Sequence, residues 1–207
     1  MSQGGGIIAL VADVHGNLPA LQAVLTDARQ SGATSIWNAG DCVGYGPFPN
    51  ECVALLRETC EHSALGNYDQ KVLAFPQRRE KWSRTKHPLK FLAFQFAWEN
   101  LDPGSRDWLA ALPQRVRTKI GRHRVLMVHA TVLGSDDAVG GRTSAKYWRR
   151  CEKTLAAQDP ADLVLGGHIH EPFEWSGQSR FVFAGAVGRP EDNDPRAHYT
   201  LIDLSGS

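Results

Sequence analysis

The stretch Ile7-Ile8-Ala9-Leu10-Val11-Ala12-Asp13-Val14-His15-Gly16-Asn17 decides the fold of this 207-residue chain. Its first six residues form an uninterrupted apolar run, which is typical of a strand that is buried on both faces. The polar residues Asp13 and His15 follow directly, where that strand must end. Apolar residues then recur at helical spacing over residues 18–28. We therefore expect a buried strand, a polar loop and a helix, in that order.

The same kinds of segment return along the rest of the chain. Further short strands are predicted at residues 34–37, 62–65, 125–128, 163–165, 181–184 and 199–202. Helical patterns cover residues 89–100, 105–112 and 142–157. Strands that alternate with helices indicate an α/β protein. We expect a single domain over residues 1–207, with a helical insertion at about 70–113.

Polar side chains follow five of these predicted strands, at the point where each strand ends. In open α/β sheets, this carboxyl edge is where ligands bind. Each of the residues is ordinary when taken alone, but their number makes a shared site more probable. All of them offer oxygen or imidazole donors, and none is a thiolate: Asp13, His15, Asp41, Asn67, His129, His168 and His170.

Seven such donors are too many for one tetrahedral ion. They suit two ions of five or six coordination that share a bridging carboxylate. Oxygen and imidazole ligands favour manganese, iron, zinc, cobalt or nickel. Two ions about 3.5–4 Å apart can clamp a phosphoryl group and lower the pKa of a bridging water to about 7. The resulting hydroxide attacks phosphorus, so the chemistry requires no protein nucleophile.

Composition excludes several other classes of protein. The chain is 42% hydrophobic and 22% charged with a net charge of +1, which is typical of a soluble globular protein and not of one that binds long nucleic acids. No apolar run approaches the roughly 20 residues that cross a membrane. Four cysteines show no paired CxxC spacing. We expect reduced, mostly buried thiols and a cytoplasmic location.

The near-neutral net charge is a cancellation between segments. Residues 1–69 carry two basic and seven acidic side chains, whereas residues 70–90 carry seven basic ones and one acidic one. The basic stretch either faces an anionic substrate or is a solvated surface of the insertion.

The motifs Asp13-x-His15, Gly40-Asp41, Gly66-Asn67, His129 and Gly167-His168-x-His170, in this order, resemble those of the calcineurin-like metallophosphoesterases. The similarity is greatest to the small prokaryotic phosphoesterase branch. It covers nearly the whole chain, up to the closing segment Gly185-Ala186-Val187-Gly188-Arg189-Pro190. The resemblance implies two facing β-sheets flanked by helices, which is a four-layer αββα fold.

The resemblance also implies a role for each donor and a cofactor of two divalent transition-metal ions. Asp13, His15 and His170 would hold the first ion, and Asp41 would bridge. Asn67, His129 and His168 would hold the second. We expect Mn²⁺ foremost, with Fe, Zn, Ni or Co as alternatives. Asp41, Asn67 and His129 are the expected catalytic residues.

The sequence departs from the family pattern at one position. Many relatives have Gly-Asn-His-Asp, whose histidine protonates the leaving group, whereas this chain has Gly66-Asn67-Tyr68-Asp69. A phenol with an ordinary pKa near 10 donates a proton less readily than an imidazolium. Tyr68 is therefore either a weak general acid or a packing wall of the site. Asp69 would orient the histidine that is missing here, or it caps the following helix.

Three more residues are candidates for substrate contact, each with a plainer alternative. Asn17 either binds a metal-bound phosphate or caps the first helix. Tyr45 lies in the loop after the bridging aspartate and is expected to line the pocket. Arg189 either reaches a phosphate or pairs with Glu191 or Asp192.

The sequence therefore predicts a metal-dependent hydrolase of small phosphorylated substrates, without a membrane partner. The lack of an acid histidine favours small phosphodiesters or activated phosphates. A phosphoprotein (Ser/Thr-type) phosphatase is the alternative enzyme. A non-catalytic protein-binding scaffold of the same fold is the alternative from another class. That alternative predicts eroded metal ligands, whereas all seven positions keep donors here.

Overall fold

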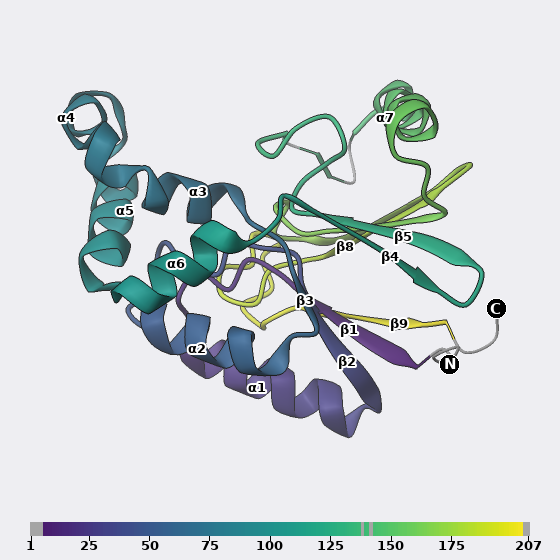
Figure 1. Ribbon diagram of the computed structural model, residues 1–207, viewed down its shortest axis with the longest axis horizontal. Coiled ribbons are helices and arrows are strands. Elements are labelled where there is room, and N and C mark those ends of the chain that lie inside the picture. Colours follow the sequence, from purple (N-terminus) through teal and green to yellow (C-terminus); the bar gives the residue numbers. More distant parts are fainter. Residues whose placement is uncertain (1–5, 138, 141–142, 205–207) are drawn as a thin grey trace.

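The structure is a computed structural model that describes residues 6–137, 139–140 and 143–204. Two β-sheets face each other, with helices outside both (Figure 1). The first sheet has the strand order β3-β2-β1-β9, with bounds β3 His62–Ser63, β2 Ala33–Asn38, β1 Ile7–Val11 and β9 Thr200–Asp203. The second has the order β4-β5-β6-β8-β7, with bounds β4 Arg115–Ile120, β5 His123–Val128, β6 Leu163–Gly166, β8 Arg180–Ala184 and β7 Pro172–Ser176.

Parallel pairing gathers the ends of the inner strands at one edge of each sheet. β1 pairs in parallel with β2, and β2 with β3. In the second sheet, β6 pairs in parallel with both β5 and β8. The strands β9, β4 and β7 pair antiparallel at the sides of this parallel core. The loops that leave the carboxyl ends of the parallel strands can therefore converge on one site.

Alternate residues of β1 point into two different apolar layers. Ile8 and Leu10 pack between the sheets, against residues such as Met127 and Leu165. Ala9 and Val11 belong to the layer between the first sheet and its helices. Because this strand is apolar on both faces, it reads in the sequence as a continuous hydrophobic run. A third apolar layer lies between the second sheet and α7, with Trp148 at its centre.

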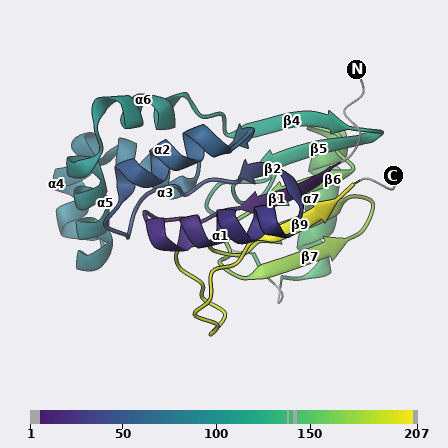
Figure 2. The same cartoon turned by 90° about the horizontal axis from the view of Figure 1, so that it is seen from below.

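The helices cover the outer faces of both sheets, which confirms the αββα architecture. α1 and α2 lie side by side over the first sheet (Figure 2), and α7 lies over the second (Figure 1). The helices α3 to α6 follow one another between β3 and β4. The bounds are α1 Leu18–Gln30, α2 Pro49–Thr59, α3 Asn67–Leu73, α4 Phe75–Thr85, α5 Pro88–Asn100, α6 Pro103–Ala111 and α7 Ala145–Gln158.

Two strands, β4 and β7, were not predicted from the sequence. β4 and β7 are edge strands that alternate between more and less buried positions, so neither contains a continuous apolar run. The helix predicted over residues 142–157 is α7, which begins at Ala145; Arg142, its predicted first residue, lies outside the described residues.

Two further findings concern membrane-spanning helices and the cysteine thiols. No helix in the described ranges is long and apolar enough to span a membrane. The four cysteines are free thiols, and all but Cys60 are buried.

Leu10 is fully buried between the two sheets, so we expect its truncation to destabilise the protein strongly. Leu10→Ala should lower the free energy of unfolding by about 2–5 kcal/mol, because it leaves a cavity between two sheets. Urea titration measures this change. Leu92→Ala is the control, since Leu92 on α5 is 57% exposed. Equal losses for the two variants would contradict this layer assignment.

Candidate metal centre

The loop after β1 lies against the loop after β2. The backbone nitrogen of Asp13 donates to the carbonyl of Gly40 at 2.9 Å, and that of His15 donates to the carbonyl of Asp41 at 2.9 Å. Gly66 packs against the same loop, where an added Cβ would lie 2.1 Å from both the backbone nitrogen and Oδ1 of Asp41. The glycine of the Gly66-Asn67 motif is thus required for close approach.

The chain takes an unusual backbone conformation at these strand ends. Among the described residues, six other than glycine have a positive φ: Asp13, His15, Asp41, His168, His170 and Asn193. All except Asn193 are predicted metal ligands. A positive φ is costly for a residue with a side chain, and such residues concentrate at functional sites. The surrounding hydrogen bonds hold these residues in a conformation that turns several donors toward one point.

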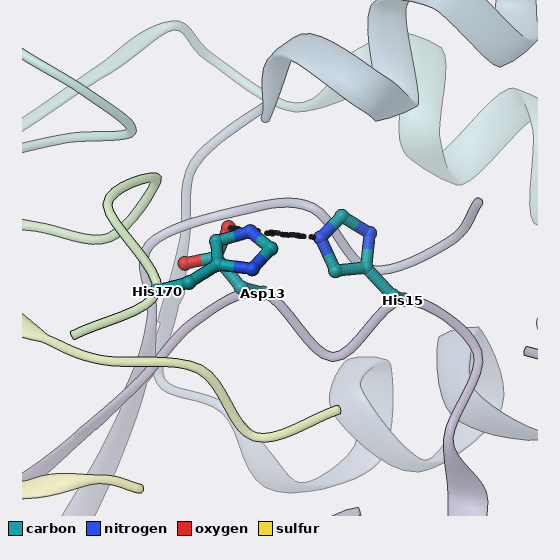
Figure 3. Close-up of side chains that lie close together, drawn as sticks. All are labelled: Asp13, His15 and His170. Carbon is teal, nitrogen blue, oxygen red and sulfur yellow. Dashed lines mark hydrogen bonds and ion pairs between the residues drawn. The ribbon is translucent and has the colours of Figure 1, made fainter. Parts of the chain in front are cut away.

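Asp13, His15 and His170 form the first cluster of donors (Figure 3). Oδ1 of Asp13 lies 3.4 Å from Nε2 of His170 and 3.9 Å from Nε2 of His15. The two Nε2 atoms are 3.2 Å apart. The other carboxylate oxygen of Asp13 accepts a hydrogen bond of 2.7 Å from the backbone nitrogen of His168.

Backbone carbonyls orient three of the four site histidines. Nδ1 of His129 is 2.9 Å from the carbonyl of Ala39, Nδ1 of His170 is 2.6 Å from that of Arg189, and Nδ1 of His15 is 3.4 Å from that of Val43. A carbonyl can only accept, so each Nδ1 must carry the proton. In its neutral form, each ring then presents the lone pair of Nε2 to the site, which is the usual arrangement of metal-binding histidines.

Asp41 stands between the two halves of the site. Its Oδ2 lies 3.9 Å from Nε2 of His15 and 3.4 Å from Nε2 of His129. Its Oδ1 accepts a hydrogen bond of 2.7 Å from the backbone nitrogen of Tyr68. Asp13, Asp41 and His129 form a second cluster of potential ligands. Asp41 therefore lies between imidazoles of both halves of the site, and Asp13 belongs to both clusters.

His168 and Asn67 lie on the side of His129. The ring of His168 packs edge-on to that of His129, with 5.1 Å between centroids, but it belongs to neither tight cluster. Asn67 is buried at the start of α3, where Gly66 is the N-cap. Five of the seven predicted donors thus lie in two tight clusters, His168 packs against His129, and the set around His129 is less tightly closed than the set around His170.

Burial and mutual charge shift the acidities of the central pair in opposite directions. Burial alone raises the pKa of Asp41, but the adjacent His129 imidazole outweighs burial and holds that pKa well below its usual range. Burial lowers the pKa of His129, and the carboxylates of Asp41 and Asp13 outweigh it, so the pKa rises to about 9. Without another cation, a proton on His129 therefore neutralises Asp41.

Three buried polar atoms of the site have no hydrogen-bond partner within the described part of the chain: Oδ1 of Asp13, Oδ1 of Asn67 and Nε2 of His129. An unpaired polar atom costs about 1–3 kcal/mol when it is buried. Each of the three belongs to a predicted ligand and can offer a lone pair, Nε2 of His129 once its proton has been displaced. Bound cations would satisfy all of them, so these residues fit a divalent metal centre.

Tyr45, Tyr68 and Arg189 pack together beside His15, whereas Asn17, also predicted to touch substrate, takes its alternative role as a helix cap. The hydroxyl of Tyr45 shares a hydrogen bond with that of Tyr68, and both rings pack edge-on to His15. The guanidinium of Arg189 lies 4.4 Å from the ring centroid of Tyr45 and pairs with Glu191 at 2.8 Å. Asn17 caps α1 by accepting from the backbone nitrogen of Ala20 at 3.3 Å.

Asp69 takes a structural part in this site. Its carboxylate accepts hydrogen bonds of 3.1 Å from the backbone nitrogens of Gly66 and Val43. The first bond caps α3, and the second fixes the loop after Asp41. Burial, with the charge of Asp41 in addition, raises the pKa of Asp69 to about 7.

Sequence reasoning missed one residue that touches the site. Asp136 follows β5 in a loop without any motif, yet it contacts Asn67 and Lys71. Lys71 belongs to the basic stretch, but its spacing in the sequence gave no sign of this contact. A single sequence does not show which distant residues meet in space, so nothing in it could identify Asp136.

Comparisons with known proteins agree with this geometry. The family model described as the calcineurin-like phosphoesterase superfamily domain matches residues 7–207. The uncharacterized protein MJ0912 of Methanocaldococcus jannaschii is 28% identical to the chain, over 95% of this chain and 82% of the relative.

Solved structures show the same fold. A metallophosphoesterase from Sphaerobacter thermophilus has a TM-score of 0.77 and 27% identity, covering 96% of this chain and 84% of that one. The hypothetical protein PH1004 from Pyrococcus horikoshii has a TM-score of 0.76 and 20% identity, covering 96% of this chain and 87% of that one. Since the family model matches nearly the whole sequence and the resemblance is thereby confirmed, the chain belongs to the calcineurin-like phosphoesterase superfamily.

Proposed function

We propose that this protein is a dinuclear metal-dependent phosphoesterase that hydrolyses small phosphodiesters or activated phosphates. One observation carries the proposal. Oδ2 of Asp41 lies within 4 Å of imidazoles from both halves of a buried site that contains unpaired lone-pair donors. Two buried carboxylates and four histidines without compensating cations would be unfavourable.

In this proposal, Asp13, His15 and His170 hold one ion, and Asn67, His129 and His168 hold the other. Asp41 lies between the two sets. Mn²⁺ is the ion that we expect, with Fe, Zn, Ni or Co as alternatives. When bound, such ions neutralise phosphoryl charge and make water a nucleophile near neutral pH. The cytoplasmic location expected from the thiols is part of the same proposal.

The wall formed by Tyr45 and Tyr68 determines which leaving groups depart well. Burial raises the pKa of Tyr68, and the hydrogen bond to Tyr45 raises it further. A phenol of raised pKa stays protonated and can donate a hydrogen bond, but it gives up its proton poorly. Leaving groups that need no proton, such as aryl or anhydride oxygens, should therefore be preferred. Arg189 stacks on Tyr45, but its charge is paired with Glu191 at 2.8 Å, so it would contact a phosphate only by leaving that partner.

A phosphoprotein phosphatase would use the same metal centre on a different substrate. A non-catalytic scaffold would have no reason to keep seven donors, five of them in costly backbone conformations, around buried polar atoms that lack a hydrogen-bond partner in the described part of the chain. The geometry favours the enzyme over the scaffold, and an assay with a phosphoserine peptide separates the two enzymes.

The first prediction concerns metal-dependent turnover. Chelator-stripped protein should hydrolyse bis(p-nitrophenyl) phosphate after addition of Mn²⁺, in preference to a phosphoserine peptide. Asp41→Asn should lower kcat/KM by more than about 100-fold, because loss of a bridging ligand exceeds the 10–100-fold typical of residues that only orient ligands. Asp107→Asn, on the exposed surface of α6, is the matched control. No turnover with any of several metals would favour the scaffold.

The second prediction concerns the missing acid. Tyr68→His should raise the rate on unactivated alkyl phosphates relative to aryl phosphates, because an imidazolium protonates a poor leaving group. Tyr68→Phe removes the hydroxyl alone and should leave the aryl rate nearly unchanged. Steady-state kinetics on paired alkyl and aryl substrates measure both effects. Wild-type protein that cleaves both classes equally fast, in a chemistry-limited step, would refute the role given to this wall.

The third prediction concerns pH. Metal-free His129 is protonated below its raised pKa of about 9, and a metal ion needs the lone pair of the neutral ring. Mn²⁺ affinity should therefore rise from pH 6 to pH 9, by at most about tenfold per unit for one displaced proton. Calorimetry in buffers of different ionisation enthalpy detects the released proton. Binding that is independent of pH and releases no proton would contradict this electrostatic picture.

A further inference from the structure

Asp136 reaches the buried site from the surface of the molecule. Its Oδ1 accepts hydrogen bonds from Nδ2 of Asn67 and from Nζ of Lys71, each at 2.5 Å. Asn67 is buried, whereas the side chain of Asp136 is 65% exposed. The two residues lie on different segments, the start of α3 and the loop after β5. The contact therefore joins two walls of the candidate metal centre.

The partner of the Asn67 amide decides which end of that amide faces the metals. The two ends of an asparagine amide have nearly the same shape, but the oxygen ligates a cation while the NH₂ group repels it. A carboxylate can only accept hydrogen bonds, so Asp136 must face the NH₂ end. Oδ1 of Asn67 is left buried and without a hydrogen-bond partner in the described part of the chain. That is the state in which it can serve as a ligand.

The neighbouring residue anchors the loop that carries Asp136. Oδ2 of Asp137 accepts hydrogen bonds of 2.7 Å from the hydroxyls of both Thr131 and Tyr147. Tyr147 lies on α7, and Thr131 lies three residues after the end of β5. These bonds tie the loop to the second sheet and its helix. The hydrogen bonds of Asp137 thus anchor the loop at the residue next to Asp136.

Lys71 supports the contact from the other side. It lies four residues after Asn67 on α3, so both donors stand on one face of the helix. Its ammonium pairs with Asp136 and also lies 5.3 Å from the ring centroid of Tyr68. The charge of Asp136 is thereby neutralised locally, and the carboxylate is held over Asn67.

We propose that Asp136 is a positioning residue that fixes the Asn67 amide with its oxygen toward the ion on the His129 side of the centre. This inference rests on the proposed function, because it requires two bound ions. In this proposal, a residue of a surface loop orients a ligand in the donor set around His129, which is the less tightly closed of the two sets.

The test is a titration of chelator-stripped protein with Mn²⁺, followed by calorimetry for stoichiometry and affinity and by EPR for the signal of a coupled ion pair. Asp136→Ala should weaken the second Mn²⁺ by about 10–100-fold, as is typical when an outer-shell partner is lost, and leave the first unchanged. The coupled-pair signal should require correspondingly more metal. Because Asp136 is exposed, the thermal unfolding midpoint should change little.

Two matched variants separate positioning from general damage. Asp136→Asn keeps an oxygen that accepts from Nδ2 of Asn67, so it should recover part of the affinity that Asp136→Ala loses. Lys71→Met removes the ion pair but leaves the bond between Asp136 and Asn67, so its loss should be smaller than that of Asp136→Ala.

The outcomes distinguish this inference from the function on which it rests. Wild-type protein that binds fewer than two Mn²⁺ ions per chain overturns the dinuclear function, and this inference with it. Wild-type protein that binds two ions, together with Asp136→Ala that binds both with wild-type affinity, overturns the inference alone. Equal weakening of both ions by Asp136→Ala, with a lower unfolding midpoint, also overturns it, because that pattern indicates structural damage.

Discussion

The left-handed backbone at the ends of the strands is the constraint on which the rest of this structure depends. Asp13, His15, Asp41, His168 and His170 all adopt it. Each pays a conformational cost that glycine would avoid, so neighbouring elements must hold it in place. Hydrogen bonds between the loops after β1 and β2, and between Asp13 and the backbone of His168, supply that support. The two packed sheets act as the rigid frame that keeps these loops together.

The same constraint explains the polarity of the site. Turning the donors inward buries carboxylates, imidazoles and the Asn67 amide, and one atom each of Asp13, Asn67 and His129 has no hydrogen-bond partner in the described chain. Backbone carbonyls already occupy Nδ1 of three histidines, which leaves their Nε2 lone pairs toward one another and toward Asp41. Such a set is unfavourable alone and favourable around cations. The Asn67 amide has no intrinsic preference for either orientation, and the hydrogen bond from its Nδ2 to Asp136 leaves its oxygen free to face a cation.

The buried strand β1 and the edge that carries the ligands were predictable from the sequence, because both leave a local pattern of apolar and polar residues. β1 is apolar on both faces, so a continuous run marks it, and the polar residues just after it mark the ligand edge. The edge strands β4 and β7 were missed because half-buried strands lack such a run. Asp136 could not be found, because its role arises from a contact with Asn67 across 69 positions of the chain. The stacking of Arg189 on Tyr45 likewise depends on how separate loops meet.

A crystal of the protein grown with Mn²⁺, with diffraction measured at the manganese absorption edge, tests the central claim most directly. The account predicts two anomalous peaks about 3.5–4 Å apart, with Asp41 between them. One peak should lie beside Nε2 of His15 and His170, and the other beside Nε2 of His129 and Oδ1 of Asn67. A single peak, or peaks that do not contact Asp41, would contradict the dinuclear centre on which the proposed function depends.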